Sequence, residues 1–146
     1  MKIRKAKKTD LKEYLNLRRE DIQECAKLTH QKIKVPVKEN TVEFMNIIKS
    51  KKGIIFFAED KKLIGYIIGE TEKNIWGEKG YINYFFVKQE FRKKGVGSDL
   101  LKNFISELKK RKITRCNLHV DLENKKAIKL YERFNFKQDS ILMKLK

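Results

Sequence analysis

The stretch YINYFFVKQEFRKKGVGSDLL, residues 81–101, decides the fold expected of this chain of 146 residues. Residues 81–87 are rich in β-branched and aromatic side chains, which is typical of a strand. Gly95 and Gly97 follow, at the start of an apolar pattern with helical spacing. The residues of that pattern are Val96, Leu100, Leu101, Phe104, Ile105 and Leu108. The sequence therefore predicts a strand, a glycine-containing turn and a helix with one buried face.

The glycine-containing turn has the properties of a phosphate-binding site. Backbone N–H groups at a helix start are unpaired, and the helix dipole attracts an anion there. Arg92, Lys93 and Lys94 add positive charge. Two familiar phosphate loops are excluded, because Ser98 follows Gly97 without the lysine of a Walker A loop and position 100 lacks the third glycine of a dinucleotide fingerprint. The alternative is a solvated basic helix start whose glycines allow close packing.

The segments before this stretch predict two helices and a hairpin. We expect a strand over residues 2–6 and a helix over residues 10–27 that starts with a capping box between Asp10 and Glu13. A second helix is expected to start at Asn40. Two β-rich runs around residues 60–61 indicate an antiparallel hairpin, and we expect residues 73–80 to form a loop.

The segments after it predict a further strand over residues 116–120, a helix capped by Asn124 and a closing strand over residues 140–145. A strand–helix–strand unit over residues 81–120 implies one parallel pair in a mostly antiparallel sheet. Neither a linker nor an internal repeat interrupts the chain. The sequence therefore predicts a single α+β domain, residues 1–146.

Composition narrows the class of protein. Lys and Arg number 36 against 19 Asp and Glu, a net charge of +17, which implies attraction to polyanions. Cys25 and Cys116 lack a CxxC partner, which favours a reducing compartment over a disulfide scaffold or a structural zinc site. No metal is expected. No run approaches the roughly 18 apolar residues that span a bilayer, so we expect a cytoplasmic protein with no membrane partner.

Two motifs together indicate a family. The pattern Arg92-x-x-Gly95-x-Gly97 after a strand resembles the acyl-CoA-binding motif of the GNAT superfamily of N-acetyltransferases. The segment ENKKAIKLYERFNF, residues 123–136, resembles the downstream element of that family, and the order of elements agrees along nearly the whole chain. Asn135 replaces the usual glycine at a position that demands a left-handed conformation, which asparagine tolerates. The resemblance implies flanking helices and a twisted sheet whose central parallel pair is splayed.

The resemblance also implies acetyl-CoA as the cosubstrate and a set of binding residues. The backbone of the strand end would pair with pantetheine, and the amide near Val87 would polarise the thioester carbonyl. The turn would bind the pyrophosphate, and Asn124 would touch the cofactor arm. The residues so implied are Phe85, Phe86 and Val87 for pantetheine and Arg92, Lys93, Lys94, Gly95, Val96, Gly97 and Ser98 for the pyrophosphate.

Three residues are implied for catalysis. Tyr131 matches the tyrosine that protonates the leaving thiolate in the family, although it also lies on an apolar helical face that suits a core residue. His119 takes the place of the usual base, and Tyr81 matches a tyrosine found with histidine in some N-terminal acetyltransferases. A His119–water–Tyr81 arrangement would then take the amine proton. The alternative is a histidine packed between sheet and helix.

The function expected is acetyl transfer from acetyl-CoA to a primary amine by direct attack. The Tyr81 and His119 matches favour a peptide or protein amine as the acceptor. A small-molecule amine, such as a polyamine or an antibiotic, is one alternative. A basic protein that binds RNA or the ribosome is another, although dispersed lysines favour nucleic acid less than clustered arginines would. The expected assembly is a monomer or homodimer.

Overall fold

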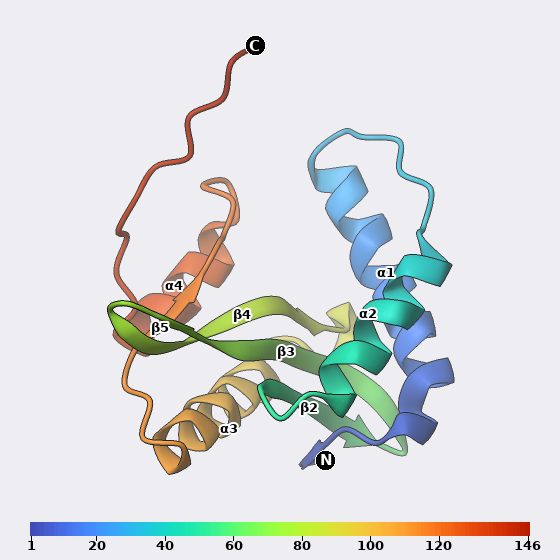
Figure 1. Cartoon of the computed structure of the whole chain (residues 1–146). Helices are drawn as coiled ribbons and strands as arrows, with labels where there is room; N and C mark the ends of the chain where they lie inside the picture. The colour runs from blue at the N-terminus through green and yellow to red at the C-terminus, as the bar shows by residue number, and fades with distance from the viewer.

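The computed structural model describes all of residues 1–146 and contains a five-stranded sheet with helices on both faces (Figure 1). The strands are β1 (Lys2–Lys5), β2 (Gly53–Asp60), β3 (Lys62–Asn74), β4 (Gly77–Val87) and β5 (Cys116–Leu118). The helices are α1 (Leu11–Leu28), α2 (Val37–Lys49), α3 (Val96–Lys110) and α4 (Lys125–Arg133), with short 3-10 turns η1 (Lys8–Asp10) and η2 (Gln89–Phe91). None of the helices combines the length and the apolar character needed to cross a membrane.

The sheet has the mixed topology that the sequence predicts. Its strands lie in the order β1-β2-β3-β4-β5, and every pair is antiparallel except β4–β5. Helix α3 makes the crossover between these two parallel strands. The parallel pairing is short, since it joins Gly80–Ile82 only to Cys116–Leu118. From Asn83 onward, β4 has no neighbour on that side.

A β-bulge marks the place where β4 leaves β5. Tyr84 pairs with Ile68 and Ile82 pairs with Gly69, so Asn83 is the extra residue on β4. Bulges bend the strand and increase its twist. The bend begins where the pairing with β5 ends, and it leaves residues 83–87 of β4 with a free edge.

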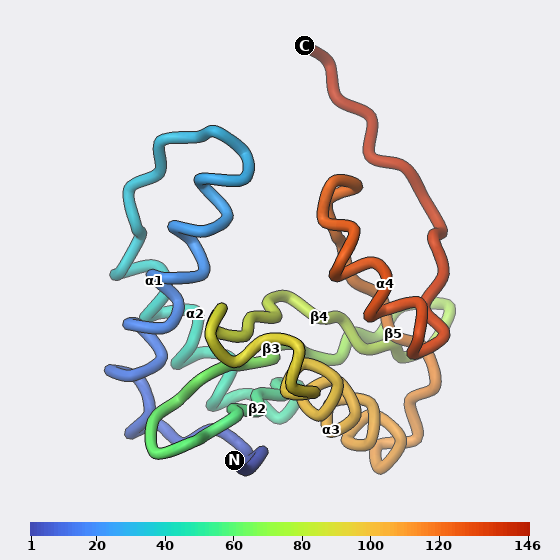
Figure 2. The backbone as a smooth tube through the Cα atoms, turned by 180° about the vertical axis from the view of Figure 1, so that it is seen from behind, coloured from blue at the N-terminus to red at the C-terminus, as the bar shows by residue number.

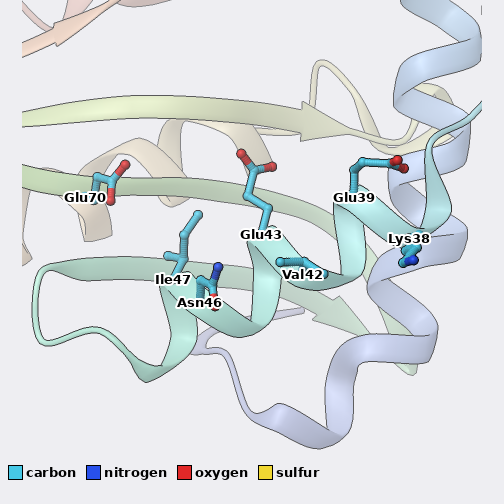
Figure 3. A pocket seen from close by; sticks show the side chains of 7 residues that line it. All are labelled: Lys38, Glu39, Val42, Glu43, Asn46, Ile47 and Glu70. Carbon is cyan, nitrogen blue, oxygen red and sulfur yellow. The ribbon is translucent and has the colours of Figure 1, made fainter.

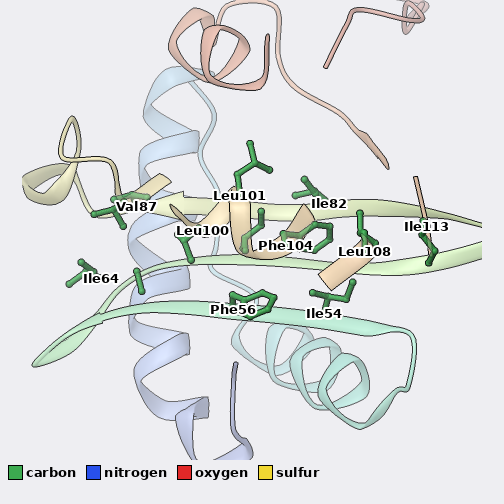
Figure 4. Close-up of a cluster of buried hydrophobic side chains, with 13 residues drawn as sticks. Ile54, Phe56, Ile64, Ile82, Val87, Leu100, Leu101, Phe104, Leu108 and Ile113 are labelled. Carbon is green, nitrogen blue, oxygen red and sulfur yellow. The ribbon is translucent and has the colours of Figure 1, made fainter. Parts of the chain in front are cut away.

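Two hydrophobic clusters hold the helices on the sheet. One joins α1 and α2 to one face, with Tyr14 and Phe44 stacked at a centroid distance of 4.6 Å. The other packs α3 against the opposite face and includes Phe104 and Leu100 (Figure 4). Gly69 allows this helix to approach, because a Cβ there would lie 2.6 Å from Cζ of Phe104. Burial of both faces stabilises the sheet by the hydrophobic effect.

The predicted closing strand over residues 140–145 is wrong. The chain leaves the body after α4 and extends away from it in both views (Figures 1 and 2). Ile141 and Leu142 remain 81% and 73% exposed. The apolar run has strand character, but a strand also needs a partner edge, and no strand pairs with this segment. The parallel pair consequently lies at one edge of the sheet and not at its centre.

The predicted start of α2 and the predicted capping box at the start of α1 are also corrected. Helix α2 begins at Val37 after Pro36, whose carbonyl accepts the Asn40 N–H at 2.9 Å, so Asn40 is a buried residue of the first turn and not the cap. Proline suits a helix start because its missing N–H would be unpaired there. Glu13 does not complete a capping box with Asp10. Its carboxylate accepts the Leu63 N–H at 3.0 Å and thereby joins α1 to β3.

The predicted loop over residues 73–80 is a tight turn. Strand β3 continues to Asn74 and β4 starts at Gly77, so only Ile75 and Trp76 connect them. The Asn74 side chain stabilises this turn by accepting the Trp76 N–H at 2.8 Å. The hairpin is therefore longer than the local sequence pattern indicates.

Candidate active site

The turn before α3 has the geometry of an anion-binding site. Gly95 has a φ of 83° and Lys93 a φ of 61°, which are left-handed values. The backbone N–H groups from Lys93 to Ser98 donate to no carbonyl of the turn or of the loop before it. No atom lies within 4 Å of the position that a Cβ on Gly95 would occupy. Unpaired amides around an open space at a helix N-terminus form a site that suits phosphate.

The free edge of β4 leads to this turn. The Lys88 N–H donates to the Ile64 carbonyl at 2.8 Å, which makes Val87 and Gly65 a non-hydrogen-bonded pair. The N–H and C=O of Val87 therefore point away from β3, toward the free edge, and those of Phe85 do the same. An extended amide-containing ligand can pair with these groups as a strand would.

Gly97, in the first turn of α3, lies close to both the end of β4 and α4. A Cβ at Gly97 would be 3.4 Å from the Phe85 ring and 3.4 Å from Leu130 of α4. The first turn of α3, β4 and α4 thus meet at one residue without a side chain. The amide-lined turn and the free edge together fit a ligand with a diphosphate at one end and an extended amide arm at the other, as in acyl-CoA.

The guanidinium group of Arg92 is held by hydrogen bonds to other residues of the protein. Its Nε donates to the Val87 carbonyl at 2.8 Å, and its two terminal nitrogens donate to the Glu24 carboxylate at 2.9 and 2.5 Å. Lys94 lies with Nζ 5.7 Å from the centroid of the Phe91 ring. Lys93 and Lys94 are therefore the positively charged residues of the turn that form no salt bridge with a carboxylate.

Tyr131 lies on α4 facing the end of β4. Its ring packs edge-on against Phe85, with 6.0 Å between centroids, and against Phe136 at 5.8 Å. Burial, and to a lesser degree the charge of Asp21, raises the pKa of the Tyr131 phenol to about 12. The hydroxyl therefore keeps its proton at neutral pH and can donate it.

The structure brings Tyr81 and His119 into direct contact. Tyr81 lies on β4, and His119 follows the last residue of β5. The Tyr81 hydroxyl and the His119 Nδ1 share a hydrogen bond, and the ring centroids are 5.7 Å apart. Burial, and then the charge of Glu72, raises the pKa of the Tyr81 phenol. The pair can pass a proton between its two members.

The sequence pattern of the Acetyltransferase (GNAT) family matches residues 14–136 of this chain. The chain belongs to the GNAT family. It is 28% identical to the N-alpha-acetyltransferase of Saccharolobus solfataricus over 87% of this chain and 81% of that protein. It is 26% identical to the N-alpha-acetyltransferase of Sulfurisphaera tokodaii over 97% of this chain and 90% of that protein. This GNAT protein is an acyl-CoA-dependent N-acetyltransferase.

Solved structures agree with the fold. The BH1408 protein of Bacillus halodurans, crystallised as a tetramutant, superimposes with a TM-score of 0.88 at 20% identity and covers 100% of this chain and 99% of that one. A predicted acetyltransferase of Clostridium acetobutylicum, crystallised with acetyl-CoA, superimposes with a TM-score of 0.80 at 18% identity over 99% of this chain and 95% of that one. At these identities the likeness shows the GNAT fold.

Two asparagines of the GNAT motif segment have clear structural roles. The Asn124 side chain accepts the Ala127 N–H at 3.3 Å and caps α4, as predicted. Its side-chain NH₂ makes no hydrogen bond to another residue. Asn135 has a φ of 69°, the left-handed conformation expected where the family has glycine.

A buried polar network lies behind β4 that sequence analysis did not find. Arg18 forms a salt bridge with Asp21 at 2.8 Å and lies 3.8 Å from the centroid of the Tyr84 ring. The Tyr66 hydroxyl donates to Asp21, and the Tyr84 hydroxyl donates to Glu43 at 3.1 Å. Burial raises the pKa of Asp21. Only the spacing of Arg18 and Asp21 on one helical face is visible in the sequence, because the tyrosines come from distant strands.

An acidic cavity lies on the same face of the sheet as this network. It has a volume of about 560 Å³ and is lined by six residues of α2 and Glu70 of β3 (Figure 3). Three of the lining residues, Glu39, Glu43 and Glu70, are carboxylates. Glu70 pairs directly with Tyr81 across β3 and β4, so the two side chains lie on the same face. The cavity therefore adjoins the Tyr81–His119 pair, whereas the anion-binding turn lies at the other end of β4.

No group of three or more histidine, cysteine or acidic side chains lies close enough together to hold a metal ion. His119 contacts Tyr81 and no carboxylate. Of the two cysteines, Cys25 is exposed, and Cys116 is half-buried on β5.

Proposed function

We propose that this enzyme transfers the acetyl group of acetyl-CoA to the α-amino group of peptide or protein N-termini by direct attack. The observation that carries the proposal is the direct hydrogen bond between the Tyr81 hydroxyl and the His119 Nδ1. This hydrogen bond joins β4 to the residue that follows β5, beside the point where these strands separate. The N-alpha-acetyltransferases among the relatives support the same acceptor class.

Acetyl-CoA would bind along the free edge of β4. The unpaired N–H groups of residues 93–98 would hold the diphosphate, and Lys93 and Lys94 would balance its charge. The backbone N–H and C=O of Phe85 would pair with a pantetheine amide. The Val87 N–H would then polarise the thioester carbonyl as charge develops on its oxygen.

The amine proton would leave through the Tyr81–His119 pair. In neutral His119 with its hydrogen on Nε2, Nδ1 accepts the Tyr81 hydrogen. As the amine attacks the thioester carbon, Tyr81 Oη takes the amine proton and passes its own to Nδ1. Tyr131 donates its proton to the departing CoA thiolate, after which solvent takes the extra proton from His119 and returns one to Tyr131. Each proton transfer thus connects groups that are neutral before the reaction.

The test is CoA release on a panel of amines. We expect release with peptides that have a free N-terminus and none with the same peptides acetylated at the N-terminus, even when they contain lysine. Mass spectrometry should place one acetyl group on the first residue. Release that depends only on lysine side chains would contradict the proposed acceptor and leave the reaction class intact.

The acidic cavity favours a second candidate acceptor, a small polycationic amine. Glu39, Glu43 and Glu70 bring negative charge to this cavity in a chain whose net charge is +17, and Glu70 pairs with Tyr81 across β3 and β4. A polyamine or aminoglycoside would be attracted to that cavity although the rest of the protein repels it. Including both in the panel distinguishes the candidates, since a higher kcat/KM for these amines than for any peptide would favour this acceptor class.

A further inference from the structure

Helix α1 is clamped to the loop that enters the diphosphate turn. Glu24 binds both terminal nitrogens of Arg92, at 2.9 and 2.5 Å, and one turn earlier Glu20 lies 3.4 Å from Lys88. A bidentate arginine–carboxylate pair fixes orientation as well as distance. The Glu20–Lys88 pair has a single contact and imposes no such orientation.

The clamp extends from Arg92 to the last residue of β4. While its two terminal nitrogens each donate one hydrogen bond to Glu24, Arg92 donates a third from Nε to the Val87 carbonyl at 2.8 Å. That carbonyl and the Val87 N–H both face the free edge. Arg92 therefore occupies one of the two groups through which Val87 could pair with a ligand, and leaves the other, the N–H, available.

We propose that Glu24 is a positioning residue of this enzyme, which acts through Arg92 to hold the Val87 carbonyl and thereby fixes the backbone at Val87 with its N–H directed at the thioester carbonyl. The proposal rests on the acetyl transfer proposed above. Val87 has no partner in β5, because the strands pair only as far as Ile82. Its free side would otherwise be held by nothing on that edge, and an oxyanion donor must be held in place before the reaction to be effective.

The Arg92–Glu24 pair lies near the surface, so either residue can be substituted without loss of the fold. The side chains of Arg92 and Glu24 are 38% and 35% exposed, and exposed ion pairs contribute little to stability. Glu24→Gln removes the negative charge from the bidentate Arg92–Glu24 pair and leaves the hydrophobic clusters intact. Glu20→Gln is the matched control, since it makes the same change one turn away and touches only Lys88.

The experiment compares kinetics and thioester polarisation in these variants. In Glu24→Gln we expect kcat to fall by about 10-fold, less than the roughly 100- to 1,000-fold loss on removal of an oxyanion donor, because the Val87 N–H is displaced and not removed, with KM for acetyl-CoA changed less than about twofold. The infrared stretch of carbonyl-labelled acetyl-CoA bound to the enzyme should move toward its frequency in water. Arg92→Lys should reproduce both effects, because lysine keeps the charge and lacks the fork. Glu20→Gln should match the wild type.

The outcomes separate this proposal from the proposed function. A wild-type enzyme that releases no CoA with any amine would refute the proposed function. An active wild type whose Glu24→Gln variant keeps both kcat and the carbonyl frequency would overturn the positioning role. Equal weakening of CoA and acetyl-CoA binding, with an unchanged carbonyl frequency, would also overturn it and assign Arg92 to the diphosphate.

Discussion

At the scale of single residues, Tyr131 combines a core position with a chemically useful group. Its ring packs on Phe85 and Phe136, and its pKa of about 12 keeps the hydroxyl protonated. From the sequence alone, Tyr131 fits either a core residue or a general acid. The two roles are compatible, because the packed ring leaves the hydroxyl protonated and an acid role needs only that hydroxyl.

Tyr131→Phe should lower kcat by about 100-fold, within the range for loss of a general acid. The affinity for acetyl-CoA and the melting temperature should change little, because phenylalanine keeps the ring contacts. Steady-state kinetics under conditions where chemistry limits the rate, with calorimetry for binding, measure the two effects. Full activity across the pH range would show that Tyr131 is only a packing residue.

His119 yields a prediction of pH dependence. If His119 accepts the Tyr81 proton, kcat/KM should rise with pH, and His119→Ala should flatten that limb and slow turnover. Acceptor ionisation produces a similar rise, so peptides whose amines differ in basicity serve as the control. A limb that moves with the acceptor and survives in the alanine variant would exclude His119 from proton transfer.

At the scale of elements, the site is made by the end of β4 and the start of α3. The bulge at Asn83 turns β4 from β5, and the left-handed residues at Lys93 and Gly95 turn the chain into α3. Together they place a free strand edge beside unpaired amides. In the proposed function, the cofactor would be positioned by two strands that separate and by the helix that connects them.

Gly97→Glu should abolish most acetyl-CoA binding. The substitution puts a carboxylate between Phe85, Leu130 and the proposed diphosphate site, where its charge repels phosphate. Gly97→Ala is the control, because a Cβ there meets Phe85 and Leu130 at 3.4 Å, an ordinary contact. Calorimetric titration should show at least about a 100-fold weaker Kd for the glutamate variant and a small change for alanine. Equal binding by all three proteins would refute the phosphate role of this turn.

At the scale of the whole molecule, the sheet separates two packed cores, and both contain ionisable groups in their neutral form. Burial raises the pKa of the Cys116 thiol from 9.0 to about 12 and, with Asp21, that of the Tyr131 phenol from 10.0 to about 12. Burial likewise raises the pKa of Tyr66, which is fully buried between α1 and the sheet. The folded protein therefore resists deprotonation that the unfolded chain undergoes.

These groups predict alkaline destabilisation. Because their pKa values are higher in the folded state, their contribution is fully present below the unfolded values and is lost as pH rises through the folded ones. The free energy of unfolding should be nearly constant up to pH 8.5. It should then fall by about 1.4 kcal/mol per pH unit for each group that has begun to titrate, Cys116 from about pH 9 and the tyrosines from about pH 10.

Urea unfolding at pH 8, 9, 10 and 11 measures this loss. Cys116→Ala should delay its onset from about pH 9 to about pH 10, since the tyrosines then titrate first. Constant urea midpoints between pH 8 and pH 11 would contradict the prediction.

Features that depend on residues close together in the chain can be predicted from the sequence alone. The apolar period of α3, the capping of α4 by Asn124 and the left-handed Asn135 are each set by residues a few positions apart. The motif around Gly95 and Gly97 likewise indicated the anion site, because unpaired amides and glycine conformations are properties of a short segment. Local hydrogen bonding and helical period are sufficient to specify these features.

Contacts between residues far apart in the sequence are visible only in the tertiary structure. The apolar run at residues 140–145 predicted a strand that finds no partner, and the hairpin extended through residues that locally resemble a loop. The contacts of Arg92 with Glu24 and Val87, and of Tyr81 with His119, join residues that no periodicity relates. Strand pairing and side-chain contacts between elements depend on the register and bend of the sheet, which are settled when both faces are buried together.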